Sequence, residues 1–339
     1  MNKILVVGDT HFRSNLSFAD YIDDKREPEE KEILDFIIKQ ANDCSTVVFL
    51  GDLMNSRTNP PEVIKKAVNF IEAFDGKELF ILKGNHDDYG GKSTLDFLAE
   101  IKNKRWCIIT NKIEEKNGMV FCPYFTKQEL DEKTNEDATK KLIKMLPDGN
   151  ILFVHHAISG SKSKEIPVSV FDEIVIPRLK IEKKYKSIFA GHVHTSSAIN
   201  NSIITGAIFT HDVNEINTYV WKLDIATIKT EQIKLPGRAI YGLTDPTLKD
   251  LAKLDKSSIV KVTITKKLDK KDMAELKDTL NEFDASMVIE QIKDERKKLY
   301  LEKGASMIDF NINNLLKLYS DERNVPLDKL LKGLELINL

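Results

Sequence analysis

The sequence predicts an α/β protein whose first half is built around a parallel sheet with helices on both faces. Short apolar runs at 4–7, 46–50 and 78–82 are typical of strands that are buried on both faces. Helical patterns lie between them, at about 28–42 and 59–74; each has a proline near its start and apolar residues at helical spacing. Strands and helices that alternate in this order indicate a parallel sheet, because each crossover between parallel strands needs a connecting element.

The middle of the chain continues this pattern. Further helices are expected over 94–103 and over most of 127–146. Further strands are expected at 106–109, 119–122, 151–154, 187–190, 203–205 and 218–221. Residues 228–235 alternate between apolar and polar side chains, and we expect them to close a second sheet.

Turn signals place a domain boundary near 240–255, where Pro236-Gly237 is followed by Asp245-Pro246. Beyond it, a strand at 259–264, a helix at 270–283 and a strand at 286–292 form a small α/β unit. Two short amphipathic helices follow within about 308–336. The predicted domains are therefore 1–240, 255–303 and a helical tail at 306–339.

Composition limits the classes of protein that are possible. Of 339 residues, 41% are apolar and 31% are charged, as is usual for a globular protein in water. No apolar run approaches the length of a membrane span, and the three cysteines (Cys44, Cys107, Cys122) have neither disulfide nor metal spacing, so we expect a cytoplasmic protein without a membrane partner. The net charge of −2 gives no general support for nucleic-acid binding, so any such surface must be local.

Metal-binding types of side chain follow the predicted strands, at the point where each strand ends. Six of the seven histidines lie at such positions, together with aspartates and an asparagine: Asp9, His11, Asp52, Asn85, His86, Asp87, His155, His156, His192 and His194. Carboxyl ends of parallel strands meet at one edge of a sheet, where ligands bind. Mixed imidazole and carboxylate ligands suit Mn, Fe or Zn, and two such cations about 3.5–4 Å apart can clamp both reacting oxygens of a phosphate ester.

These motifs resemble the five motifs of calcineurin-like metallophosphoesterases. They are Gly8-Asp9-x-His11, Gly51-Asp52, Gly84-Asn85-His86-Asp87, His155 and Gly191-His192-x-His194. The resemblance covers residues 8–194 and implies a two-sheet α/β sandwich, here followed by a small α/β capping domain and a helical tail. Within that superfamily the chain is most similar to the SbcD-type nuclease subunit of double-strand-break repair complexes and its phage counterparts. The features that carry this closer similarity are Gly51–Arg57, Val154–Ile158 and the region after residue 240.

The resemblance also implies a role for each residue. Asp9, His11 and His194 would hold one divalent metal, Asn85, His155 and His192 the other, and Asp52 would bridge them, with Mn as the expected ion. His86 would be the catalytic histidine and Asp87 would orient it. Asn55 stands where many relatives carry Asp or His and is left outside the ligand set. His156 remains an alternative to His155.

The expected function is that of a metal-dependent DNA exonuclease or endonuclease in recombination and repair, which works as a homodimer with an ABC-type coiled-coil ATPase. The tail would dock on that ATPase, or else cover its own domain. The apolar face around Val63, Val68 and Ile71, with the loop after Asn55, is a candidate dimer contact; the alternative is that these residues pack inside their own sheet. A small-molecule phosphodiesterase or phosphatase, and a non-catalytic DNA-bridging scaffold, are the alternatives; the scaffold is disfavoured because no ligand position is missing.

Two further features have an open interpretation. His211 could line the substrate groove or be a solvated loop residue. The basic run Lys180–Lys186 could contact DNA phosphates, although such a run is more often a solvated helix face.

Overall fold

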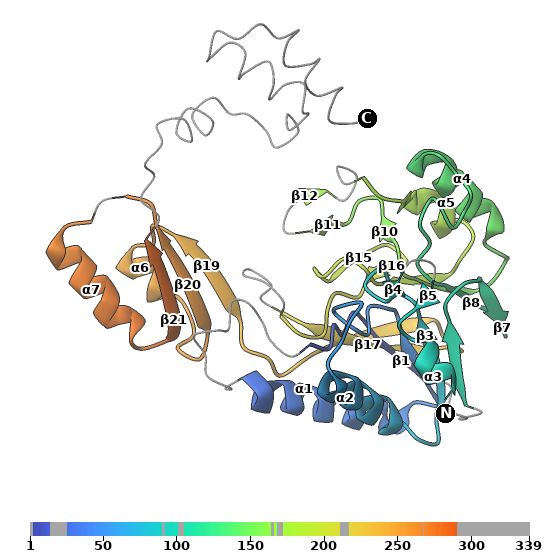
Figure 1. The fold of residues 1–339 in the computed structure, drawn as a ribbon, viewed down its shortest axis with the longest axis horizontal. Coiled ribbons are helices and arrows are strands. Elements are labelled where there is room, and N and C mark those ends of the chain that lie inside the picture. Colours follow the sequence, from blue (N-terminus) through green and yellow to red (C-terminus); the bar gives the residue numbers. More distant parts are fainter. Residues whose placement is uncertain are drawn as a thin grey trace, which may run out of the picture. The chain divides into compact units, whose positions relative to one another are not determined.

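The computed structural model describes residues 3–13, 26–89, 92–100, 105–163, 166–167, 172–210, 217–266 and 268–289. Within these ranges the chain forms two six-stranded sheets and one three-stranded sheet, besides three short two-stranded ribbons (Figure 1). By Cα proximity the chain divides into one unit of Met1–Thr263 with Leu268–Val288 and a second of Ile264–Lys267 with Ile289–Leu339. Most of the second unit, including the predicted helical tail, lies outside the described residues.

The first six-stranded sheet has the order β18-β17-β1-β2-β3-β6. Its strands are β1 (Lys3–Val7), β2 (Thr46–Phe49), β3 (Glu78–Leu82), β6 (Trp106–Ile109), β17 (Tyr219–Asp224) and β18 (Lys229–Lys234). The first four are parallel, whereas β17 pairs antiparallel with β1 and β18 antiparallel with β17. The prediction that 228–235 closes the second sheet is therefore wrong: the hairpin folds back onto β1, so that β18 becomes the outer strand of the first sheet.

The two faces of the first sheet have different covers. On one face, Leu5, Val47 and Phe49 pack with helices α1 (Arg26–Gln40) and α2 (Pro61–Glu72). On the other face, alternate residues such as Ile4 and Val48 pack against the second sheet. Helices on both faces were predicted from the strand pattern, and this is wrong for the second face. A continuous apolar strand shows that both faces are buried, but not what buries them.

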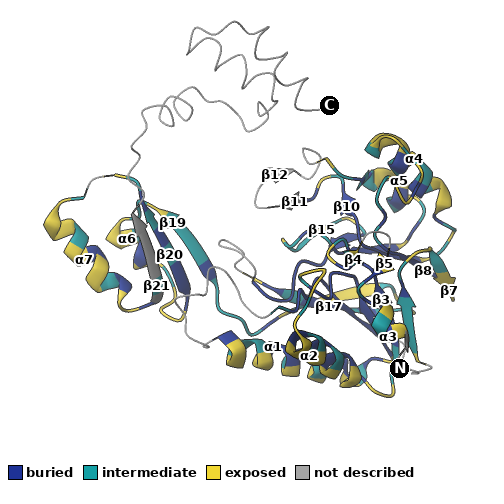
Figure 2. Cartoon of the chain, viewed as in Figure 1, coloured by how far each residue is buried: buried dark blue, intermediate teal, exposed yellow. Residues whose placement is uncertain are grey.

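The second six-stranded sheet has the order β15-β16-β14-β9-β8-β7. Its strands are β7 (Glu114–Lys116), β8 (Met119–Cys122), β9 (Ile151–Val154), β14 (Ser187–Ala190), β15 (Ser197–Ile199) and β16 (Ser202–Ile204). Phe121, Phe153 and Phe189 form a stacked row against the first sheet, with ring centroids 5.2 and 5.5 Å apart. The opposite face packs with helices α4 (Asn135–Met145) and α5 (Arg178–Glu182). The two-sheet α/β sandwich expected from the resemblance is confirmed, and Figure 2 shows its buried strands beneath helices that expose one side.

Two helices begin later than predicted. Helix α3 begins at Asp96 rather than at 94 and is described as far as Glu100, and α4 begins at Asn135 rather than near 127. The chain before α4 turns through Asp131, whose φ of 52° is left-handed and interrupts a helix. Thr134 then caps α4, because its hydroxyl accepts a hydrogen bond from the backbone N–H of Asp137.

The remaining elements are small. The short strands are β4 (Asp88–Tyr89), β5 (Lys92–Ser93), β10 (Ala157–Ile158), β11 (Lys162–Ser163), β12 (Ile166–Pro167) and β13 (Val175–Ile176), and a 3₁₀ turn covers Ala41–Asp43. The three-stranded sheet contains β19 (Ile240–Thr244), β20 (Ile259–Ile264) and β21 (Asp284–Ile289), accompanied by α6 (Leu248–Leu251) and α7 (Lys270–Leu280). The strand–helix–strand order predicted for this region is present, while the three domain boundaries stay predictions.

The candidate dimer contact on α2 is largely inside the molecule. Val63 and Ile71 are buried in the core beneath the first sheet, and Val68 is half-buried against it. These side chains therefore pack within their own sheet, which was the stated alternative. In the part of the chain that the structure describes, no helix has the length and apolar character needed to cross a membrane.

Candidate metal centre

The predicted ligands come together where the carboxyl ends of the two sheets meet. Asp9 follows β1, Asp52 follows β2 and Asn85 follows β3, whereas His155 follows β9 and His192 follows β14. Three groups of side chains have their candidate ligand atoms within 4.8 Å of one another: Asp9, His11 and His194; His11, Asp52 and His86; and Asp52, His155 and His192. All predicted ligands except Asn85 thus belong to one of these groups, and Asn85 contacts two of their histidines.

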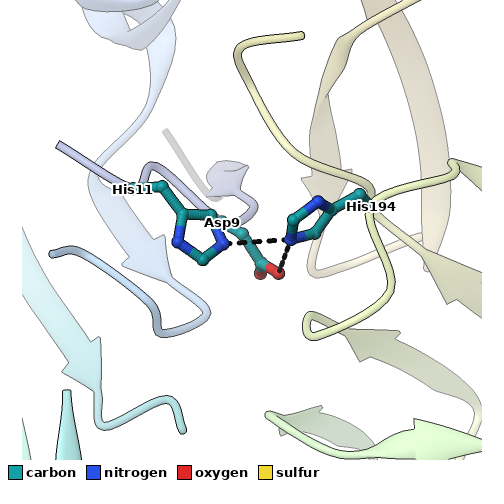
Figure 3. A group of neighbouring side chains, drawn as sticks. All are labelled: Asp9, His11 and His194. Atoms are coloured by element: carbon teal, nitrogen blue, oxygen red, sulfur yellow. Dashed lines mark hydrogen bonds and ion pairs between the residues drawn. The ribbon is translucent and has the colours of Figure 1, made fainter. Parts of the chain in front are cut away.

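The first group contains Asp9, His11 and His194 (Figure 3). The Nε2 atoms of His11 and His194 are 3.0 Å apart, and Nε2 of His194 lies 3.8 Å from Oδ2 of Asp9. Asp9 is fully buried, and its carboxylate accepts from the backbone N–H of His192 at 3.0–3.1 Å. Burial raises the pKa of Asp9 and lowers that of His11, since both charged forms lose contact with water.

The third group, which contains Asp52, His155 and His192, lies around the side-chain oxygen of Asn85. This oxygen lies 3.1 Å from Nε2 of His155 and 2.8 Å from Nδ1 of His192. Nδ1 of His155 is 2.7 Å from the carbonyl oxygen of Leu50, to which it donates, so Nε2 faces the group. Burial lowers the pKa of His155, but Asp52 and Asp9 outweigh burial and raise it to about 9.

Asp52 is shared between the groups. Its Oδ2 lies 3.5 Å from Nε2 of His11 and 3.4 Å from Nε2 of His155, while Oδ1 accepts from the backbone N–H of His86 at 2.7 Å. Burial opposes its ionisation, but the imidazoles of His155 and His11 hold the pKa of Asp52 well below its usual range. An ionised carboxylate between two sets of nitrogen donors fits the bridging position that the sequence predicted.

The donor set fits two divalent cations. In the third group, Nε2 of His155 faces oxygens of Asn85 and Asp52. Because Nδ1 of the same ring already donates to Leu50, a proton or a metal cation must lie between Nε2 and these oxygens. In the first group, two imidazole nitrogens face each other beside a buried carboxylate, and at most one proton can lie between them. Cations would satisfy all these lone pairs together, and oxygen with imidazole ligands suits Mn, Fe or Zn. The residues present therefore fit the metals that the resemblance implied.

The local backbone is shaped for this arrangement. His11, Asp52 and His192 have left-handed φ values of 48°, 49° and 77°, each of which costs about 1–3 kcal/mol unless tertiary contacts enforce it. Gly84 has no room for a side chain, because a Cβ there would lie 2.1 Å from Oδ1 of Asp52. Gly51 has a φ of 115°, and a Cβ there would meet Nδ1 of His155 at 2.4 Å. The two glycines thus let these ligands approach the chain closely.

His86 is exposed at the edge of the site. Its Nδ1 lies 2.9 Å from the carbonyl oxygen of Asn55 and its ring centroid lies 4.7 Å from that of His11. Asp87 does not make the predicted orienting contact with His86. Its buried carboxylate accepts instead from the backbone N–H groups of Leu53, Met54 and Gly84, because it bridges the loops after β2 and β3. The residue that orients the His86 ring is Asn55, through its backbone.

The adjacent residues His155 and His156 have different surroundings in the structure. His156 is buried beneath Tyr124, with ring centroids 5.0 Å apart, and its Nε2 accepts from the backbone N–H of Phe125 at 3.1 Å. Burial lowers the pKa of His156 well below its ordinary value. The ring is therefore a neutral structural group, while His155 faces the donor cluster.

One side chain at the site, that of Glu173, was not predicted from the sequence. Glu173, in the loop before β13, places Oε2 2.5 Å from Nε2 of His192, and no sequence motif marks it. His211 lies outside the described residues. In the basic run Lys180–Lys186, Lys184 has partners within the protein: it donates to the carbonyl oxygen of Leu146 and forms an ion pair with Asp148. Lys180 is exposed.

Comparison with known proteins gives one clear result. The family model described as calcineurin-like phosphoesterase matches residues 2–196, more than half of the chain. No curated protein matches this chain. Among solved structures, one described as a novel archaeal phosphodiesterase matches with 15% identity and a TM-score of 0.34, over 69% of this chain and 99% of that one. With its motifs assembled into one donor cluster, this chain belongs to the calcineurin-like phosphoesterase family.

Proposed function

We propose that this phosphoesterase is a DNA nuclease subunit that hydrolyses phosphodiester bonds in recombination and repair. One observation carries the step from phosphoesterase to nuclease. The described residues of 240–289 include a separate three-stranded sheet that lies beyond the family match, and none of these described residues belongs to the three groups of ligands. A hydrolase of small molecules has no need of such an addition, whereas an enzyme that holds a long polymer does.

The side chains have distinct tasks in this reaction. When bound, a pair of divalent cations polarises a phosphate ester and lowers the pKa of water, and Mn suits the mixed donor set. Asp52 keeps the two halves of the cluster together. Nδ1 of His86 donates to the carbonyl oxygen of Asn55, which leaves Nε2 to carry the proton that the leaving oxygen takes up as its bond to phosphorus breaks. The exposed position of His86 suits a bulky leaving group such as a DNA strand.

A nuclease assay tests this proposal directly. Purified protein with Mn²⁺ is given linear duplex DNA or a nitrophenyl phosphodiester, in parallel with the His86→Gln variant as the control for contaminating nucleases. We expect DNA cleavage that depends on Mn²⁺ and falls with the variant. Hydrolysis of the nitrophenyl ester without DNA cleavage would instead assign the enzyme to small-molecule phosphodiesters.

The proposed partner is an ABC-type coiled-coil ATPase, which would supply much of the surface that holds DNA, since the chain has a net charge of only −2. A chain that ends near Gly304 tests its docking. We expect the shortened chain to keep Mn-dependent cleavage of short substrates and to lose co-purification with the ATPase. Unchanged binding of the ATPase would place the docking contact elsewhere, and unfolding of the shortened chain would make the tail part of the core.

We also propose a homodimer. Sedimentation at micromolar concentration with and without DNA tests it, and a monomer under both conditions contradicts it.

A further inference from the structure

The loop before β13 places a carboxylate behind one of the ligand histidines. Oε2 of Glu173 is 2.5 Å from Nε2 of His192, on the ring edge opposite the nitrogen that faces Asn85. The side chains of Glu173 and His192 are 18% and 16% exposed, so water competes weakly for this hydrogen bond. Glu173 therefore contacts Nε2 of His192, the ring nitrogen that does not face Asn85.

The position of Glu173 is fixed from both sides. On one side, Asp172 accepts from the side-chain amide of Asn135 at 2.6 Å, which ties the loop to the start of α4. On the other side, Ile174 is buried, and β13 pairs with β10, the strand that follows His155 and His156. Glu173 is thus held by the same segment that carries a ligand histidine, and its approach to His192 is part of the fold.

The hydrogen bond has a consequence for the chemistry of His192. A carboxylate can only accept, so the imidazole must carry its proton on Nε2. When the ring is neutral, Nδ1, 2.8 Å from the oxygen of Asn85, then keeps its lone pair for a cation at the cluster. In the opposite tautomer, Nδ1 would donate to Asn85 and could not bind a metal. A carboxylate behind a ligand histidine also increases the basicity of the ligand nitrogen.

We propose that Glu173 is a positioning residue that holds His192 in the tautomer and orientation able to bind the second metal. It acts on the metal through His192 and takes no part in bond cleavage. The inference rests on the metal-dependent phosphoesterase site and is independent of whether the substrate is DNA, because its test needs no substrate.

Two measurements test this role. In the first, Mn²⁺ is added to metal-stripped protein and the free ion is followed by electron paramagnetic resonance. We expect wild type to bind two ions and Glu173→Ala to bind one of them about 10- to 100-fold more weakly. In the second, nitrogen NMR of the metal-free protein reports the His192 tautomer. We expect the proton on Nε2 in wild type and a shift toward Nδ1 in Glu173→Ala.

Two further variants separate positioning from a general effect. Glu173→Gln keeps an oxygen acceptor, so we expect it to recover most of the Mn²⁺ affinity and the wild-type tautomer. Asp172→Asn removes the neighbouring negative charge but keeps a side-chain oxygen that can accept from Asn135, so the loop stays tied to α4 and we expect no change in either measurement. Unaltered Mn²⁺ binding in Glu173→Ala, or a wild-type His192 with its proton on Nδ1, would overturn the proposal. So would equal losses in the Ala and Gln variants, because the carboxylate would then act through its charge alone.

Discussion

The two sheets contribute different chemistry to the same site. The loops of the first sheet supply every carboxylate in the three donor groups, and the two aspartate ligands, Asp9 and Asp52, accept hydrogen bonds from backbone N–H groups. The second sheet supplies histidines: His155 and His192 give one ring nitrogen to an oxygen acceptor and turn the other toward the cluster. The first sheet thus supplies both carboxylates of the three groups together with the imidazoles of His11 and His86, whereas the second sheet supplies imidazoles alone. Two of the three donor groups combine residues of both sheets, so the centre depends on their packing.

Asp52→Asn tests the contribution of the first sheet and should have the largest effect. The amide keeps the acceptor for the backbone N–H of His86 but removes the charge shared by both halves of the cluster. We expect Mn²⁺ affinity at both sites to fall by more than about 100-fold, since changes behind a ligand already cost about 10- to 100-fold. Calorimetric titration of metal-stripped protein checks this. A variant that still binds two ions tightly would show that Asp52 is no bridge.

His86→Gln should have the next largest effect, on turnover alone. His86 is exposed and its ring is held only through the carbonyl of Asn55, so its loss leaves the buried ligands in place. We expect kcat to fall by about 10²- to 10⁴-fold, the usual contribution of a proton-transferring side chain. Mn²⁺ affinity serves as the control and should stay within a few-fold. Full activity at saturating Mn²⁺ would remove His86 from the reaction.

The adjacent histidines of the second sheet offer a sharper comparison. His155→Ala should abolish binding of one Mn²⁺, because its Nε2 faces Asn85 and Asp52. His156→Ala should leave both ions bound but lower the free energy of unfolding by about 1–3 kcal/mol, since the buried N–H of Phe125 loses its acceptor. Urea denaturation with Mn²⁺ titration distinguishes them, and His156→Gln, which retains an acceptor, should lose less stability. If His156→Ala lost one Mn²⁺ and His155→Ala kept both, His156 and not His155 would be the ligand.

The smallest effect concerns an ion pair that joins loops of the two sheets. Lys83, buried after β3, lies 2.6 Å from Glu129 in the loop after β8. Glu129→Gln should lower the free energy of unfolding by about 1–3 kcal/mol at pH 7. Burial raises the pKa of Glu129, but Lys83 and the hydrogen bonds from Thr126 together outweigh burial and hold this pKa below the ordinary 4.5. The contribution is therefore present above pH 4.5 and is lost as the pH falls through the lower folded value.

Denaturation of wild type and Glu129→Gln at several pH values checks this sign. The difference in unfolding free energy should be constant near neutral pH and shrink on acidification. A difference that grows with acid would mean that the ion pair does not stabilise the fold. Lys140→Gln, which changes a pair of exposed charges on α4, is a matched control and should stay within about 0.5 kcal/mol of wild type.

The sequence by itself determined most strands of the sandwich and the residues at their ends, whereas the short outer strands β7 and β15 were not predicted. Buried strands such as β3 and β9 are short, continuous apolar runs with polar residues on both sides. This pattern is typical of a buried strand, so their bounds were predicted closely. Polar residues follow these strands: Asp52 follows β2 and Asn85 follows β3. They were identified as ligands because such polar side chains have no structural reason to recur at strand ends. Both are properties of local sequence, and they needed no knowledge of distant contacts.

The tertiary structure alone decided which groups meet. Neighbouring side chains such as His155 and His156 differ in role only because one faces the first sheet's loops and the other faces Tyr124. Asp87 bonds backbone groups rather than His86, and Glu173 reaches His192 from a loop without a motif. The prediction of helices on both faces of the first sheet was wrong for one face, because an apolar strand packs equally well under helices or another sheet. These choices depend on contacts between residues far apart in the chain, which local patterns do not encode.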